Sequence, residues 1–311
     1  MGNVGRLLVA GAISLCAASV AEAQLPNASA GESFVTGEPA APAGKRPRFR
    51  APAPSDATST ASPQVTNGTE AVAADWQATL LSEDSGCTVT AVGPLALLTA
   101  AHCLKFSKTI TIVISNAERT AICDLSGRYS DQYDQTKTPT AEDWDRASAD
   151  YALCRIIDGG PGLAPNRFET ISNAPVLSNN DVVRIIGYGC NGTTLLSTGG
   201  GKLREGTARI GALPQGDNNY IELRADGSQN NAIVCKGDSG GAAYWPTPKD
   251  ERKIIGINSR TGVKSDGKTL SGRSFITSMD TVTGIDFALT WARTNNVQVC
   301  GVWGGTSRCR E

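Results

Sequence analysis

The 311-residue sequence has a single histidine, few aromatic residues (5%) and a formal net charge of only −1. Its one short basic run is Lys45–Arg50, so the clustered positive charge that nucleic-acid binding needs is missing. We therefore expect no nucleic-acid partner. The scarcity of aromatic residues, together with 34 glycines, favours a loop-rich β protein over a helical one.

Long hydrophobic runs are also missing after the first residues of the chain. Arg6, the apolar run Leu7–Val20 and an A-x-A site ending at Ala23 have the form of a secretory signal peptide. This run is shorter than the roughly 20 apolar residues of a membrane-spanning helix. A lipoprotein anchor at Cys16 is disfavoured because a bulky residue precedes it. We predict a signal peptide at 1–23, with the mature protein extracellular, or periplasmic in a Gram-negative host, and not bound to a membrane.

No C-x-x-C pair occurs, and the only histidine lies beside Cys103, so the sequence offers no ligand set typical of structural zinc. Glu142, Asp143 and Asp145 are interpreted as solvated residues of a polar loop. A calcium loop there is the minor alternative, because their spacing matches no EF-hand. We expect no metal. After signal removal eight cysteines remain, and an even number in an exported chain favours disulfides.

The chain divides by composition. Residues 24–64 are rich in Ala, Pro, Ser, Thr and Gly and lack apolar periodicity, which predicts a disordered leader or propeptide. From residue 65 onward, short β-branched runs alternate with turn residues, as in a β-sandwich or barrel. One late segment, Ile285–Asn295, has helical spacing. The clearest expected strands are 109–114, 150–157, 181–189, 219–224 and 253–259.

One glycine-rich motif, Gly237–Gly241 with the sequence G-D-S-G-G, can carry nucleophilic chemistry. A serine hydroxyl is a weak nucleophile and needs an adjacent base. The flanking glycines permit a tight turn that exposes the hydroxyl of Ser239 and directs backbone N–H groups at one point. Taken alone, the motif favours a surface turn over a catalytic site.

The single histidine, His102, ends the apolar segment L-T-A-A-H-C. An imidazole is well suited to act as a general base near neutral pH. The alternative is a histidine packed at the end of a strand. A catalytic imidazole needs a buried carboxylate to fix its tautomer, and Asp150 is the best candidate because it opens the apolar run Y-A-L-C-R-I-I. An unpaired charge there would be costly.

The segments T-A-A-H-C, D-Y-A-L and C-K-G-D-S-G-G, in this order, resemble the chymotrypsin-like (trypsin-fold) serine peptidases, with bacterial members the nearest in type. The resemblance extends over residues 65–295. It implies an all-β fold of two six-stranded antiparallel β-barrels with a C-terminal helix. It also implies that His102 is the base, Asp150 its orienting partner and Ser239 the nucleophile. The oxyanion hole would be formed by the N–H groups of Gly237 and Ser239.

The resemblance extends to the cysteines. It implies that Cys87 pairs with Cys103, which fixes the loop of His102. By the pattern of bacterial members it also implies that Cys190 pairs with Cys235. The pairings left as hypotheses are Cys123–Cys154 and Cys300–Cys309.

The sequence departs from the family pattern at activation and specificity. The resemblance implies that Asp238 pairs with an α-amino group freed at Val65, but the preceding Gln64 is neither Lys nor Arg, so zymogen processing stays a hypothesis. Ile233 stands where trypsin has its pocket-floor aspartate. This disfavours Arg or Lys substrates, and we expect an apolar P1 residue. Ser259 is implied to lie beside the triad carboxylate and line the substrate cleft.

These observations predict a secreted serine endopeptidase that acts on polypeptides through an acyl-enzyme, as a monomer and without a cofactor. The alternative is a catalytically inactive binding protein on the same fold, because fold alone does not establish activity. A purely structural disulfide-rich domain would leave the ordered motifs unexplained. The expected segments are 1–23 (signal peptide), 24–64 (leader), 65–295 (peptidase domain) and 296–311 (disulfide-stapled tail).

Overall fold

The structure is a computed structural model that describes residues 33–35, 68–105, 107–131, 140–159, 162–163, 168–173, 176–190, 201–225, 231–245, 252–265, 270–305 and 308–310. All of them belong to one compact unit, Gly31–Glu311. The predicted signal peptide, most of the predicted leader and Val65 lie outside the described residues. The division into four segments therefore stays a prediction.

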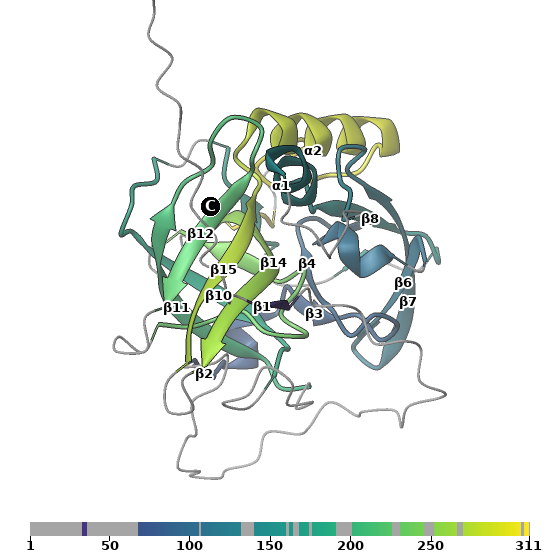
Figure 1. The fold of residues 1–311 in the computed structure, drawn as a ribbon. Helices are drawn as coiled ribbons and strands as arrows, with labels where there is room; N and C mark the ends of the chain where they lie inside the picture. The colour runs from purple at the N-terminus through teal and green to yellow at the C-terminus, as the bar shows by residue number, and fades with distance from the viewer. Residues whose placement is uncertain are drawn as a thin grey trace, which may run out of the picture. The chain divides into compact units, whose positions relative to one another are not determined.

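The first barrel consists of six antiparallel strands in the order β3-β4-β5-β8-β7-β6 (Figure 1). Ser82, directly after β3, bridges to Ile112 of β6 and so joins the two edges of the sheet. Along β6, Ile110 and Ile112 are buried and Thr109 is exposed, because successive side chains point to opposite faces of a strand. The strands are β3 (Thr79–Leu81), β4 (Thr88–Ala91), β5 (Ala96–Thr99), β6 (Thr109–Ile114), β7 (Ala117–Leu125) and β8 (Ala152–Ile156).

The second barrel also has six strands, in the order β14-β13-β10-β11-β12-β15, and pairing between β14 and β15 closes it. Three short strands are added at its edges: β1 and β9 pair with β14, and β2 pairs with β11. The strands are β1 (Ser33–Val35), β2 (Thr69–Glu70), β9 (Thr170–Ile171), β10 (Val182–Gly187), β11 (Arg204–Ala212), β12 (Tyr220–Ala225), β13 (Ala242–Tyr244), β14 (Lys253–Ser265) and β15 (Leu270–Ser278). β1 lies within the segment predicted to be a disordered leader, and no strand was expected there.

The predicted C-terminal helix is α2 (Val282–Asn295). It begins where the Thr281 side chain accepts a hydrogen bond from the Gly284 N–H, and it ends at Asn296, which has a left-handed φ of 51°. Trp291 of this helix is buried and donates from Nε1 to Asp124 Oδ2 of β7 at 2.9 Å. The helix of the second half of the chain is thereby joined to the first barrel.

The acidic segment interpreted as a polar loop is a helix, α1 (Ala141–Ser148), so that interpretation was wrong. The helix begins with a capping box: the Asp143 N–H donates to the Thr140 hydroxyl, and the Asp143 carboxylate accepts from the Thr140 N–H. Glu142 and Asp143 lie in the first turn, where negative charge is favoured.

The predicted fold class is confirmed: two six-stranded antiparallel barrels followed by a C-terminal helix. Each of the five expected strands corresponds to an observed one, and β6 has the predicted bounds. Among the helices of the described residues, none combines the length and the apolar character needed to cross a membrane.

Candidate active site

His102 is held by a short 3₁₀ turn, η2 (Ala101–Leu104), that directly follows β5. Its side chain is nearly buried, and its Nδ1 lies 2.6 Å from Asp150 Oδ2. Since a carboxylate only accepts hydrogen bonds, Nδ1 is the nitrogen that carries a proton, and in the neutral imidazole the lone pair is then on Nε2. Nε2 is buried and has no hydrogen-bond partner among the described residues. The ring is therefore held in the tautomer that a general base requires.

Asp150 is fully buried and lies two positions before β8 begins at Ala152. Burial on its own raises the pKa of this carboxyl, but the charge of His102 and the hydrogen bonds from His102 and Ser259 outweigh it, so the pKa lies below its usual value. Asp150 accepts the backbone N–H of His102 at 2.8 Å and the hydroxyl of Ser259 at 2.5 Å. It is therefore an ionised, fixed acceptor for the imidazole.

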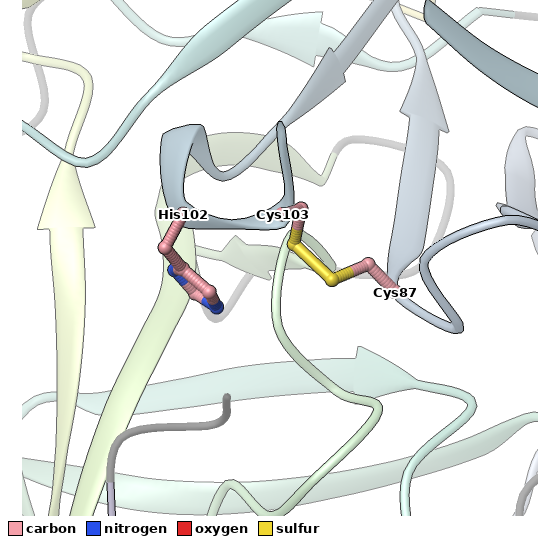
Figure 2. Close-up of side chains that lie close together, drawn as sticks. All are labelled: Cys87, His102 and Cys103. Carbon is pink, nitrogen blue, oxygen red and sulfur yellow. A yellow bond between two sulfur atoms is a disulfide. The ribbon is translucent and has the colours of Figure 1, made fainter. Parts of the chain in front are cut away.

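The disulfide Cys87–Cys103 fixes the turn that carries His102. Figure 2 shows the imidazole and the Cys103 side chain leaving the same turn, with Cys103 bonded to Cys87. Potential ligand atoms of these three residues lie within 4.8 Å of one another. Only a thiolate is a metal ligand of cysteine, and both sulfurs are used in the disulfide, so the cluster serves to position His102.

The loop of Ser239 comes from the second barrel and packs against the first. Gly237 and Gly240 have φ angles of 98° and 81°, a left-handed conformation that side chains other than glycine rarely adopt. A Cβ at Gly240 would collide with the carbonyl oxygen of Thr88 and the hydroxyl of Thr99. The Ser239 carbonyl also accepts the Thr88 N–H at 2.8 Å. The glycines thus allow the loop to lie beside the strand that leads to His102.

Two backbone donors of this loop are unused. Within the described part of the chain, neither the N–H of Gly237 nor that of Ser239 donates to an acceptor. These are the donors that the resemblance implies for the oxyanion hole. No hydrogen bond joins the Ser239 hydroxyl to His102 within the described residues. Such catalytic hydrogen bonds are often long without substrate and shorten in the complex.

Asp238 is buried and accepts the N–H groups of Gly189 at 2.8 Å and Cys235 at 3.0 Å. Burial raises the pKa of its carboxyl to about 6, against the effect of these hydrogen bonds and of the charge on Arg204. The guanidinium of Arg204 is itself buried and donates to the carbonyl of Gly189 at 3.4 Å and to that of Lys202 at 3.2 Å. Gly189 thus contacts both charged groups.

Arg204 is a residue that the sequence reasoning missed. It lies at the start of β11, opposite Gly187 of β10 and Glu70 of β2 in the sheet register. No sequence pattern marks it, because its sheet neighbours and the carboxyl of Asp238 belong to other segments of the chain. The α-amino group of Val65, the partner that the resemblance implies for Asp238, lies outside the described residues.

The two predicted substrate-binding residues occupy different environments. Ser259 is buried, and its hydroxyl contacts Asp150, as the resemblance implied. Ile233 is completely buried two positions before Cys235. A cavity of about 400 Å³ borders His102. Its lining residues are Ala101, His102, Leu104, Lys105, Ser107, Lys108, Leu125, Tyr129 and Asp131.

The described part of the chain has four disulfides, and they are the pairs implied or hypothesised above. One of them, Cys190–Cys235, joins the loop after β10 to the loop of the nucleophile candidate. Cross-links of this kind stabilise mainly by restricting the unfolded chain, each by about 3 kcal/mol. The four pairs are Cys87–Cys103, Cys123–Cys154, Cys190–Cys235 and Cys300–Cys309.

Comparison with known proteins agrees with this geometry. The family model described as Trypsin matches residues 65–283, well over half of the chain. No curated protein matches the sequence significantly. The match includes His102, Asp150 and Ser239, together with most of both barrels. The chain therefore belongs to the trypsin family, a family of serine proteases.

Proposed function

We propose that the protein is a secreted serine endopeptidase that cleaves polypeptides through an acyl-enzyme. The observation that carries this proposal is the 2.6 Å contact between His102 Nδ1 and Asp150 Oδ2, which leaves Nε2 available as a base. An inactive binding protein has no need to hold an imidazole in this tautomer. Site chemistry, not the fold, distinguishes the two alternatives.

The proposed mechanism gives each of these groups one role. Ser239 Oγ attacks the scissile carbonyl carbon, and His102 Nε2 takes the hydroxyl proton. Asp150 stabilises the imidazolium that forms. The oxyanion of the tetrahedral intermediate accepts the N–H groups of Gly237 and Ser239, each worth about a hundredfold to a thousandfold in rate. The C–N bond then breaks as His102 returns the proton to the leaving amine.

Hydrolysis of the acyl-enzyme then releases the acyl part of the substrate as a carboxylic acid. Water attacks the acyl-enzyme carbonyl while His102 takes one of its protons. The second tetrahedral intermediate collapses as the C–O bond to Ser239 breaks and His102 protonates Ser239 Oγ. The enzyme is regenerated with no change in its redox state, and no cofactor takes part in these steps.

The four disulfides support secretion, because such bonds persist in oxidising compartments. We further propose that the chain is made with a signal peptide at 1–23 and a leader that is removed before Val65, and that it acts as a monomer. Asp238 is buried and partly compensated by Arg204. A new α-amino group at Val65 would add a second positive charge for it.

The first test is covalent labelling by an organophosphonate probe, which reacts with a serine only when a neighbouring base activates it. We expect stoichiometric modification of Ser239 in the processed protein, detected by intact mass and peptide mapping. Ser239→Ala is the control for the site of labelling, and His102→Ala should also abolish it. A folded, processed wild-type protein that remains unlabelled would establish the inactive binding protein instead.

The second test concerns specificity. With Ile233 at the position of the pocket floor, an Arg or Lys side chain in the pocket would have no negative partner, and a buried unpaired charge is costly. We expect a peptide-library cleavage profile to show apolar residues at P1. A clear preference for Arg or Lys would contradict the assignment of Ile233 to the pocket floor while leaving the catalytic mechanism in place.

A further inference from the structure

The cavity that borders His102 lies between two walls of the first barrel. One wall is η2 with the residues that lead into β6, and the other is the end of β7 with the residues that follow it. β6 and β7 pair with each other (Figure 1), so the two walls are attached to neighbouring strands of one sheet. We call this space of about 400 Å³ the His102 cavity. The proposed mechanism assigns it no role.

Both walls of the His102 cavity are held by contacts within the chain. On one wall, the disulfide of Cys103 fixes η2, and the Cys123 N–H donates to the Lys108 carbonyl at 2.7 Å. On the other wall, the Tyr129 N–H donates to the Ser126 carbonyl at 3.1 Å. A ligand therefore enters a space whose shape is largely set, which reduces the ordering entropy that binding costs.

The inner lining of the His102 cavity is mainly apolar. It includes the buried side chain of Leu104 and the half-buried Leu125. Tyr129 is half-buried, but its hydroxyl oxygen is completely buried, so the accessible part of this side chain is the ring. Burial and the charge of Asp150 raise the pKa of Tyr129, so its hydroxyl stays uncharged. This lining suits the methylene groups of a ligand side chain.

Positive charge predominates at the same cavity. Its charged lining residues are Lys105, Lys108 and Asp131. The Lys105 ammonium lies 3.9 Å from the Asp131 carboxylate, so these two charges compensate each other. Lys108 is exposed, and within the described part of the chain its ammonium has no carboxylate partner. The cavity therefore offers an apolar lining together with one ammonium that can pair with a carboxylate from outside.

We propose that the His102 cavity binds an acidic side chain of the polypeptide substrate, next to the scissile bond and distinct from P1, with its carboxylate at Lys108. The location rests on the proposed endopeptidase function: His102 takes the Ser239 proton during attack on the scissile carbonyl, so residues flanking that bond lie beside His102. Glutamate fits the site better than aspartate, because it has one more methylene group for the apolar lining. Glutamine has the same length without the charge.

The first measurement compares peptides that differ only by glutamate or glutamine. Each residue is placed in turn at P3, P2, P1′ and P2′ of one peptide that the enzyme cleaves. At one of these positions kcat/KM should be about fivefold higher for glutamate, as expected for one partly hydrated ion pair. The gain should lie in KM, because the pair forms on binding and persists in the transition state. Values equal within about twofold at every position would overturn the proposal.

A set of lysine variants assigns the preference to the cavity. Lys108→Gln should reduce the ratio of kcat/KM for the two peptides to about one, and Lys108→Glu should favour the glutamine peptide. The matched control is Lys253→Gln, which removes an exposed lysine of β14 that does not line the cavity, and it should keep the fivefold ratio. Phosphonate labelling at Ser239 checks that each variant retains its catalytic groups. A fivefold ratio that survives in Lys108→Gln would overturn the assignment.

A binding measurement tests the cavity without catalysis. In the Ser239→Ala background, fluorescent glutamate peptides of the series should bind about fivefold more tightly than their glutamine counterparts, by anisotropy. High salt should reduce this difference, because it screens exposed charges, and Lys108→Gln should abolish it. Equal affinities would overturn the proposal even if the enzyme is active. If no protein hydrolyses peptides or reacts with the phosphonate, the proposed function fails, and the anisotropy result still establishes or rejects the His102 cavity as an acid-binding site.

Discussion

Replacement of His102 by alanine is expected to lower kcat by about a millionfold, the loss found when the base of such a triad is removed. The sequence has no second histidine that could substitute for it. The fold should survive, because Asp150 keeps the hydrogen bonds from the backbone N–H of residue 102 and from the Ser259 hydroxyl. We expect a loss of about 1–3 kcal/mol in the free energy of unfolding, the cost of one buried hydrogen bond.

The measurements are burst and steady-state kinetics on one peptide substrate, together with urea unfolding followed by tryptophan fluorescence. Groups that act as a unit have non-additive effects, so a His102→Ala and Ser239→Ala double variant should be no slower than either single variant. A further large loss in the double variant would show that the two residues act separately. A His102→Ala chain that does not fold would instead mean that the imidazole is needed for packing.

The parts of the site that the sequence revealed are those carried by short contiguous motifs. Asp150 was recognisable because it opens an apolar strand, where an acidic residue without a partner would be costly. Burial and the contact with His102 Nδ1 bear out that physical reason. Arg204 gave no such signal. Its proximity to Gly189 and Asp238 depends on the register of β11 with β10, and register is set by the packing of whole strands.

The sequence also predicted some elements of the fold and not others. β6 was located with its observed bounds because T-I-T-I-V-I is β-branched and has one buried face. α1 was missed because A-E-D-W-D-R-A-S is short and has only one large apolar residue, Trp144, among four charged ones, although Thr140 and Asp143 have the spacing of a capping box. β1 was missed for a different reason. Its segment has leader-like composition, and its conformation comes from an edge that lies more than 200 residues away in sequence.

A buried ion pair is expected to make the largest single contribution to stability that the sequence did not reveal. Glu169 and Arg252 are both buried, and the guanidinium donates from Nη2 to Oε1 at 2.5 Å and from Nε to Oε2 at 3.1 Å. Nη2 also donates to the Asp75 carbonyl at 2.6 Å, and the guanidinium lies 3.7 Å from the centroid of the Trp76 ring. Arg310 contacts the same carboxylate at 3.5 Å. This ion pair therefore connects the residues just before β9 and β14 with the η1 turn (Ala73–Trp76) and the C-terminal tail.

Glu169→Gln should lower the free energy of unfolding by about 3–5 kcal/mol, because it leaves Arg252 with a buried and uncompensated charge. The matched control is Asp217→Asn, which breaks an exposed pair with Arg128 and should cost less than about 1 kcal/mol. Urea unfolding with the disulfides intact measures both changes. Because Glu169 lies outside the contacts of His102 and Asp150, kcat/KM of the folded variant should equal that of the wild type. A Glu169→Gln variant as stable as Asp217→Asn would mean that Asp75 and Trp76 compensate the guanidinium without the carboxylate.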